Sequence, residues 1–220
     1  MRIKIQAQII EKTKPLKTNY SHEIYSMILN QLSTELAQDM HKKEKKFKLL
    51  TFTNICINKD LAHFYVAGDD SIVSEFIKYL DFNQLFKIDD MILKVTNISL
   101  LPNLVMKDEY MFKTKVIINT YNHELGKNQL TEDLSILKNR LIKNSKDKAK
   151  TYGFDGDIQI DIINPKQVLT RYKSGHIFSY KCLLKIKADF NIVNTIYNVG
   201  IGENTATGHG FMWEVNSGRN

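Results

Sequence analysis

The sequence is poor in cysteine and proline, and both shortages restrict the class of protein it encodes. Its 220 residues include 2 cysteines, Cys56 and Cys182, and neither has a second cysteine or a metal-ligand spacing beside it. This pattern argues against a disulfide framework and a zinc site, and predicts buried thiols in a reducing compartment, the cytoplasm. With only 3 prolines, the chain also lacks the composition of a disordered linker.

Long apolar runs and clustered carboxylates are missing as well. No stretch reaches the run of about 18 apolar residues typical of a membrane-spanning helix. No carboxylate cluster has a spacing suited to a metal ion, so we expect no metal and no other cofactor. The chain does carry basic charge, with a net charge of +7 and an isoelectric point near 9.2. This excess favours a polyanionic partner, nucleic acid first and a membrane surface second.

Hydrophobic periodicity divides the chain at Pro102 and Asn103 into two similar halves. The first half predicts strands at 2–10, 47–54, 61–66 and 86–99 (one strand or a pair) and helices at 21–40 and 72–80. The second half predicts strands at 110–120, 157–163, 178–187 and 211–215 and helices at 131–150 and 191–199. Each half has the order β-α-β-β-α-β. We therefore expect an α+β protein of two tandem ferredoxin-like domains, 1–103 and 104–220.

The densest glycine segment lies between the last expected helix and the last expected strand. Gly200, Gly202, Gly208 and Gly210 fall within eleven positions, in a chain with 10 glycines. Such density indicates positive φ or the close approach of another molecule. The helix-to-strand order excludes a dinucleotide-binding fingerprint, and no lysine follows these glycines as a P-loop requires. By glycine count alone, a flexible hairpin and a functional loop are equally open.

A second segment places a histidine beside lysines. His41 ends the first expected helix and is followed by five lysines within seven positions. They are Lys42, Lys43, Lys45, Lys46 and Lys48. Lysines attract phosphate and stabilise a dianionic phosphorane, and a histidine can move a proton near neutral pH. These residue types suit RNA cleavage by the neighbouring 2′-hydroxyl, with His41 as general base or acid and Lys48 stabilising the phosphorane. The alternative is a solvated, lysine-rich turn that favours the helix macrodipole.

Further candidate RNA contacts lie in the second half. Arg171 and Lys173 belong to an expected basic, aromatic hairpin, and Lys181 shares one strand face with other lysines. The basic residues of the expected helix 131–150, Lys148 among them, are expected to be largely solvated surface. His209, inside the glycine segment, either contacts phosphate or points to solvent. The RNP1 pattern of an RRM is absent, so base stacking on the sheet is not expected.

The pattern G-x-G-E-x-x-x-x-G-x-G-F at 200–211 resembles the glycine-rich loop of the CRISPR-associated endoribonucleases that cut precursor CRISPR RNA, the Cas-six proteins of the RAMP superfamily. His41 and the following Lys-Leu-Leu-Thr-Phe-Thr at 48–53 resemble the family's catalytic histidine and the strand after it. The tandem architecture is also the family's, so the resemblance covers nearly the whole chain. One departure concerns a tyrosine that some relatives carry on the first helix. Leu29 aligns there, and Tyr25 is the nearest tyrosine that could replace it.

The resemblance implies an antiviral-defence enzyme that cuts CRISPR repeat RNA without metal and leaves 2′,3′-cyclic phosphate and 5′-hydroxyl ends. It also implies a basic cleft that holds the repeat, with RNA contacted by the glycine segment and the basic residues. The implied RNA-binding residues are Lys42, Lys43, Lys45, Lys46, Arg171, Lys173, Lys181, Gly200, Gly202, Gly208, His209 and Gly210.

Two other functions remain open. One is a non-catalytic RAMP subunit that only binds guide RNA in an effector complex, and the other is a basic structural protein. His41 favours the enzyme, because a scaffold needs no titratable group beside its lysines. Other CRISPR effector subunits are further candidate partners, and the protein itself is expected to be a monomer or homodimer.

Overall fold

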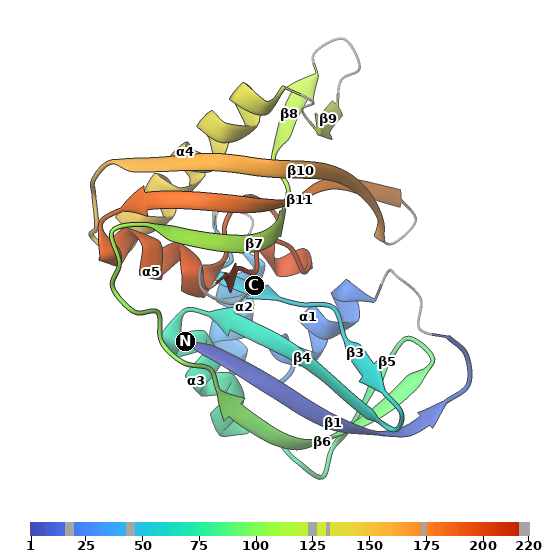
Figure 1. Ribbon diagram of the computed structural model, residues 1–220. Helices are drawn as coiled ribbons and strands as arrows, with labels where there is room; N and C mark the ends of the chain where they lie inside the picture. Colours follow the sequence, from blue (N-terminus) through green and yellow to red (C-terminus); the bar gives the residue numbers. More distant parts are fainter. Residues whose placement is uncertain (16–19, 43–46, 123–126, 131–132, 173–174, 216–220) are drawn as a thin grey trace. The chain divides into compact units, whose positions relative to one another are not determined.

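The computed structural model describes residues 1–15, 20–42, 47–122, 127–130, 133–172 and 175–215 (Figure 1). The chain forms two units, each with its own hydrophobic core. The first unit is Met1–Asn103 with two short later segments, Arg171–His176 and Ala206–Gly208. The second unit is Leu104–Thr170, Ile177–Thr205 and His209–Asn220. Among the described helices, none combines the length and apolar character that crossing a membrane requires.

The sheet of the first unit is built around strand β1 (Arg2–Lys12). It pairs antiparallel with β4 (Leu61–Gly68) on one side and with β6 (Met91–Leu100) on the other. The strand order is β2-β4-β1-β6-β5, with β2 at Leu50–Phe52 and β5 at Leu85–Ile88; β3 (Cys56–Asn58) also pairs with β4. Placing the first strand between two later ones is the split β-α-β arrangement of a ferredoxin-like fold.

Three helices, α1 (Ser21–Leu29), α2 (Thr34–His41) and α3 (Asp70–Tyr79), lie on one face of this sheet (Figure 1). Their apolar stripes are buried in the core of the unit. The prediction of one continuous helix over 21–40 is wrong, because the chain leaves the helix at residues 30–33. Ser33 begins a new helix there, and its Oγ accepts a hydrogen bond from the Leu36 amide (3.4 Å), as a serine N-cap does.

The second unit repeats the arrangement with its own sheet. The strand order is β10-β11-β7-β12, formed by Ile158–Tyr172, Gly175–Ala188, Tyr110–Val116 and Trp213–Glu214. Helices α4 (Leu134–Lys150) and α5 (Phe190–Val199) lie on one face of it (Figure 1). Here too the unit's first strand, β7, lies between two later strands and pairs antiparallel with both. The predicted α+β fold of two ferredoxin-like units is therefore confirmed.

Other details differ from the expectations. The strand predicted over 110–120 ends at Val116, and β8 (Asn119–Asn122) then pairs with β9 (Lys127–Leu130) in a separate two-stranded sheet. Cys182 is buried, which raises the pKa of its thiol to about 12, but Cys56 is exposed, contrary to the prediction. Cys56 lies on β3, a three-residue strand at the edge of the sheet, where little packs over it.

Candidate functional site

His41 is the last residue of α2, and its side chain is exposed. Tyr25 of α1 lies beside it, with the ring centroids 6.5 Å apart in an edge-to-face arrangement. The break at residues 30–33 makes this contact possible. On one straight helix, sixteen residues would separate the two positions by about 24 Å. Because the chain turns between α1 and α2, Tyr25 reaches the end of α2 and joins His41 in one corner of the first unit.

Lys48 comes from the segment just before β2 and holds the same helix end. Its ammonium donates hydrogen bonds to the carbonyl oxygen of Met40 and to that of Lys42 (3.1 Å), the residues on either side of His41. Carbonyls at a helix C-terminus lack partners within the helix, and a cation there is favoured by the macrodipole. Lys48 thus holds the segment that carries His41, and brings a positive charge to the backbone on either side of it.

The other predicted residues of this corner are described only in part. Lys42 is exposed and pairs with Asp39 at 3.2 Å, whereas Lys43, Lys45 and Lys46 lie outside the described residues. The chemistry available is therefore an imidazole, a phenolic hydroxyl and an ammonium. Within the described part of the chain, no group of three or more His, Cys, Asp or Glu side chains is placed to hold a metal ion.

The glycine segment adopts the backbone that its composition predicted. Gly200, Gly202, Gly208 and Gly210 all have positive φ, at 86°, 79°, 82° and 78°. Two of them also meet the protein's own backbone. A Cβ added to Gly210 would lie 2.1 Å from the Ile201 carbonyl oxygen, and one added to Gly202 would lie 3.0 Å from the Ile117 carbonyl oxygen. The close approach that requires glycine at these positions is therefore an approach of the chain to itself.

Most of the loop glycines are buried. Gly200, Gly202 and Gly210 are buried, and the Gly200 and Gly210 amides donate to the carbonyls of Ile196 (2.9 Å) and Lys115 (2.7 Å). Their positive φ and these hydrogen bonds shape the loop, and their contact with RNA stays a prediction. His209 is only 2% exposed, so of its two alternatives the one that points to solvent does not fit, and contact with phosphate stays a prediction.

Residues 204–208, which include the 3-10 turn η1 (Thr205–Thr207), hold the accessible part of the loop. Asn204 is exposed, and residues 206–208 are half-buried. Gly208 belongs to the first unit, where a Cβ on it would lie 3.2 Å from the Phe52 ring and 3.4 Å from Ser21 Oγ. Of the four predicted glycines, Gly208 is thus the one that keeps some exposure.

Lys148 of α4 supports this loop from inside the second unit. It is 2% exposed, and its ammonium donates hydrogen bonds to the carbonyl oxygens of Gly200 and Gly202, both at 2.8 Å. Burial lowers the pKa of Lys148 from 10.5 to about 7, although attraction to Glu203 opposes the shift. The prediction that Lys148 is solvated surface is wrong. A signal was present, since Lys148 follows Leu141 by seven residues and so continues the buried face of the helix.

The open face of the second sheet carries basic residues at paired positions. Lys181 on β11 lies directly opposite Lys115 on β7, and Lys113 on β7 lies opposite Trp213 on β12, which is 38% exposed. Lys113 and Lys181 are exposed, whereas burial lowers the pKa of Lys115. The strand pattern of β7 could have revealed Lys113 and Lys115, but the lysines predicted on this pair of strands were those of β11.

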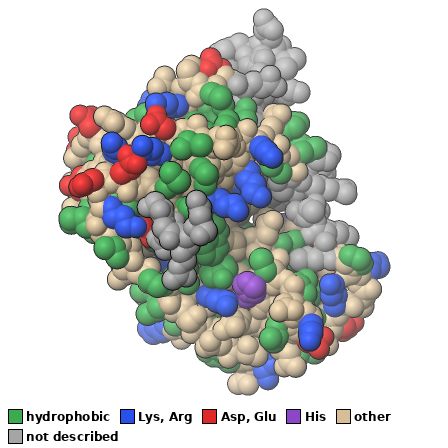
Figure 2. Space-filling view, in the orientation of Figure 1, with side chains coloured by type: hydrophobic (Ala, Val, Ile, Leu, Met, Phe, Trp, Pro, Cys, Tyr) green, Lys and Arg blue, Asp and Glu red, His purple; other side chains and the backbone are tan. Residues whose placement is uncertain are grey.

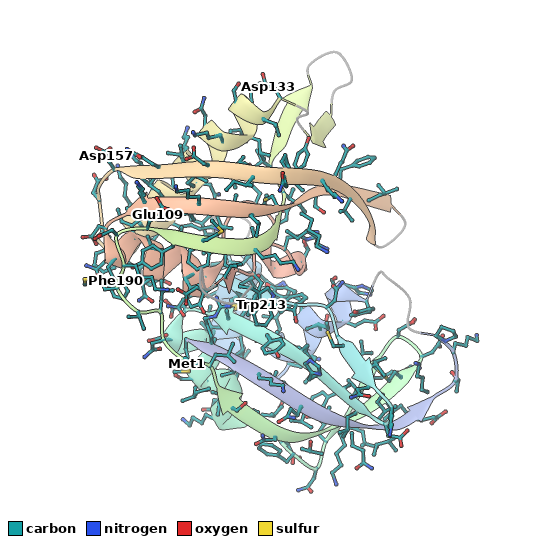
Figure 3. All side chains as sticks on the ribbon, in the orientation of Figure 1. Met1, Glu109, Asp133, Asp157, Phe190 and Trp213 are labelled. Carbon is teal, nitrogen blue, oxygen red and sulfur yellow. The ribbon has the colours of Figure 1, made fainter. Side chains whose placement is uncertain are left out.

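Ion pairs neutralise the charge of other lysines on that basic face. Glu109, labelled in Figure 3, pairs with Lys185 at 3.0 Å and with Lys187 at 3.1 Å, and both lysines lower the pKa of its carboxyl. Figure 2 shows Asp and Glu side chains together with Lys and Arg side chains toward one edge of the second unit, and further Lys and Arg side chains among hydrophobic ones. Arg171 lies in β10, and Lys173 lies outside the described residues.

Several solved structures have the same fold as this chain. A structure described as a RAMP protein binding different RNA substrates is 20% identical, with a TM-score of 0.84 over 98% of this chain and 100% of that one. A Cas6-related protein from Pyrococcus furiosus is also 20% identical, with a TM-score of 0.84 over 99% of both chains. The CRISPR endoribonuclease Cse3 bound to a 19-nucleotide RNA is 10% identical, with a TM-score of 0.54 over 98% of this chain and 100% of that one. At these identities the likeness concerns the fold alone.

The sequence itself decides the family. Residues 101–214, more than half of the chain, match the family described as CRISPR associated protein Cas6, C-terminal, and the chain therefore belongs to the Cas6 family. The resemblance drawn from the glycine segment and the His41 region is confirmed at this level. No curated protein matches the chain.

The glycine geometry predicts different costs for two alanine substitutions in the second unit. Gly153 has φ 79° with nothing within 4 Å of an added Cβ, so Gly153→Ala should cost only the left-handed strain of about 1–2 kcal/mol. Gly210→Ala adds a backbone overlap, which should cost about 1–3 kcal/mol more, the scale of overpacking. Denaturant unfolding of both variants measures the difference. Equal losses would contradict the close approach of Gly210 to Ile201.

Proposed function

We propose that this chain is a metal-independent endoribonuclease that cuts CRISPR precursor RNA within the repeat. The observation that carries the proposal is the corner formed by Tyr25, His41 and Lys48, in which the imidazole has a tyrosine ring at 6.5 Å and an ammonium bonded to the carbonyls on either side of it. Membership of the Cas6 family supports CRISPR RNA as the substrate. The structural neighbours include a Cas6 product complex and an RNA complex of Cse3.

The proposed reaction is an internal transesterification. The 2′-hydroxyl oxygen attacks the adjacent phosphorus while His41 accepts its proton, and the P–O5′ bond breaks. The leaving 5′ oxygen takes a proton from the protonated His41 or from the Tyr25 hydroxyl. Lys48 offsets the negative charge that builds up on the phosphorane. The products carry a 2′,3′-cyclic phosphate and a 5′-hydroxyl, and the cut repeat RNA would serve antiviral defence as a guide.

RNA binding in this proposal uses the basic and aromatic surfaces described above. On the second unit, Lys113, Lys115 and Lys181 would contact phosphates, and the exposed Trp213 offers a face on which a base could stack. On the first unit, the half-buried Gly208 would approach the RNA backbone. The remaining candidates are Lys42, Lys43, Lys45, Lys46, Arg171 and Lys173.

The second candidate function is a non-catalytic RAMP subunit that holds guide RNA. Such a subunit would need the lysines but not the arrangement around His41. Two separate helices and the Lys48 hydrogen bonds converge on the exposed end of α2, where a scaffold has no use for a proton-transfer group. This observation favours the enzyme.

His41→Ala should slow cleavage of repeat RNA by about 10²-fold or more, because a proton-transfer group is lost. Single-turnover cleavage in EDTA, with the protein in excess over RNA, measures the chemical step without a metal requirement. His63→Ala is the matched control, since His63 lies on β4 of the same unit and packs against Tyr65. Its rate should equal that of the wild type. Full activity of His41→Ala would remove His41 from the mechanism.

Lys181→Ala should weaken RNA binding and reduce the slope of log affinity against log salt by about one, the effect of losing one phosphate contact. Lys185→Ala is the control on the same strand, because its ammonium is paired with Glu109. Lys185→Ala should reduce the salt slope less than Lys181→Ala does. Titrations across a salt series give both slopes, and identical slopes for wild type and Lys181→Ala would show that Lys181 contacts no phosphate.

A further inference from the structure

The ammonium group of Lys148 is buried, at a position in the helix where an apolar side chain could fill the same space. Removing an ammonium from water is costly unless the charge is paired or fully hydrogen-bonded. Well-packed apolar residues often replace buried charges without loss of stability. The Gly200 and Gly202 carbonyl oxygens, each 2.8 Å from the ammonium nitrogen, accept hydrogen bonds from Lys148 and so compensate part of the cost of its burial. The presence of lysine at this position is therefore explained by what it does to the glycine loop.

The two peptide groups that Lys148 contacts are held at both ends. The carbonyl of Gly200 accepts from Lys148, and the amide of the same peptide, from Ile201, donates to the Gly210 carbonyl at 3.0 Å. The carbonyl of Gly202 also accepts from Lys148, and the Glu203 amide donates to the Ile117 carbonyl at 2.9 Å. Since a peptide group is planar, fixing its carbonyl and amide fixes its orientation. These two orientations direct the chain into Asn204.

We propose that Lys148 is a positioning residue for RNA binding, which holds the Gly200 and Gly202 carbonyls inward and so sets the conformation in which the exposed Asn204 of the same unit meets RNA. The inference rests on the proposed RNA-binding function. Lys148 acts through the loop, because it is buried inside the second unit. Its location at the end of α5 adds to the effect, since a cation is favoured at a helix C-terminus.

The pKa of Lys148 depends on the charged groups of the elements that surround it. Glu203 attracts it from the loop and itself pairs with Arg140 of α4 at 3.1 Å, whereas α5 carries no charged residue. Lys146 and Lys150 of α4 pair with Asp157 and Asp155.

The pKa of Lys148 is about 7 in the folded protein and 10.5 in an ordinary lysine. Between these pH values the unfolded chain binds more protons than the folded one. The stability of the wild type should therefore rise with pH across this window and be flat below it. Relative to a variant without the ammonium, its unfolding constant should fall by up to about tenfold per pH unit.

The test compares wild type, Lys148→Met and Lys146→Met. Methionine keeps the apolar stem and removes the ammonium. Lys146 lies on the same helix and pairs with Asp157 at 3.0 Å, so its variant loses the same charge away from the loop. Hydrogen exchange of residues 200–210 is measured without RNA, with β7 and β11 as the internal reference. Affinity for repeat RNA is measured at pH 6 across a salt series, and unfolding is measured from pH 6 to 10.

Lys148→Met should speed loop exchange and weaken RNA binding, each by about tenfold, the scale of a hydrogen bond to a charged group. Its salt slope should equal that of the wild type, because no phosphate contact is lost. It should also lack the rise in stability between pH 7 and 10. Lys146→Met should leave loop exchange at the wild-type rate.

Three results would overturn the inference: unchanged loop exchange in Lys148→Met, an equal rise of exchange in β7 and β11, or a salt slope reduced by one. The second would make Lys148 a residue of the general fold, and the third a direct phosphate contact. A wild-type protein that binds no repeat RNA would instead overturn the proposed function. The loop-exchange measurement needs no RNA, so the two failures can be told apart.

Discussion

A lysine ammonium bonded to the carbonyls at the C-terminal end of a helix occurs in each unit, and each time the helix leads into a segment of functional interest. In the first unit Lys48 bonds to Met40 and Lys42 at the end of α2, where His41 lies. In the second unit Lys148 bonds to Gly200 and Gly202 just beyond α5, where the glycine loop begins. The negative end of a helix dipole is a natural place for a cation. In the first unit the lysine comes from the next few residues of the chain, and in the second it comes from another helix.

The basic surface is smaller than the 31 lysines and arginines suggest. Ion pairs on the second unit join Lys138 to Asp161, Lys146 to Asp157, and Lys185 and Lys187 to Glu109. Exposed pairs of this kind contribute little stability, but they cancel charge locally. Lys113 and Lys181, which are exposed on β7 and β11, are therefore the proposed contacts to a polyanionic partner on this sheet.

Local patterns in the sequence were sufficient for the strands but not for contacts between separate elements. The alternation of buried Cys182, Leu184 and Ile186 correctly predicted β11. The break after α1 contains neither glycine nor proline, so only the capping hydrogen bond of Ser33 reveals it. The same break brings Tyr25 to His41, which helical spacing alone places far apart. Lys148 was missed because it belongs to a helix with many basic residues, and its carbonyl partners lie more than fifty residues away.

The break between α1 and α2 also bears on how such a chain can change in evolution. Lys48 bonds to the backbone on either side of His41 through contacts that span at most eight residues. The position of Lys48 relative to this backbone therefore depends on a short local segment. An insertion or deletion within residues 30–33 would move α1 relative to α2 and leave the spacing from His41 to Lys48 unaltered. Such a change would shift Tyr25 relative to His41 without altering the contacts of Lys48.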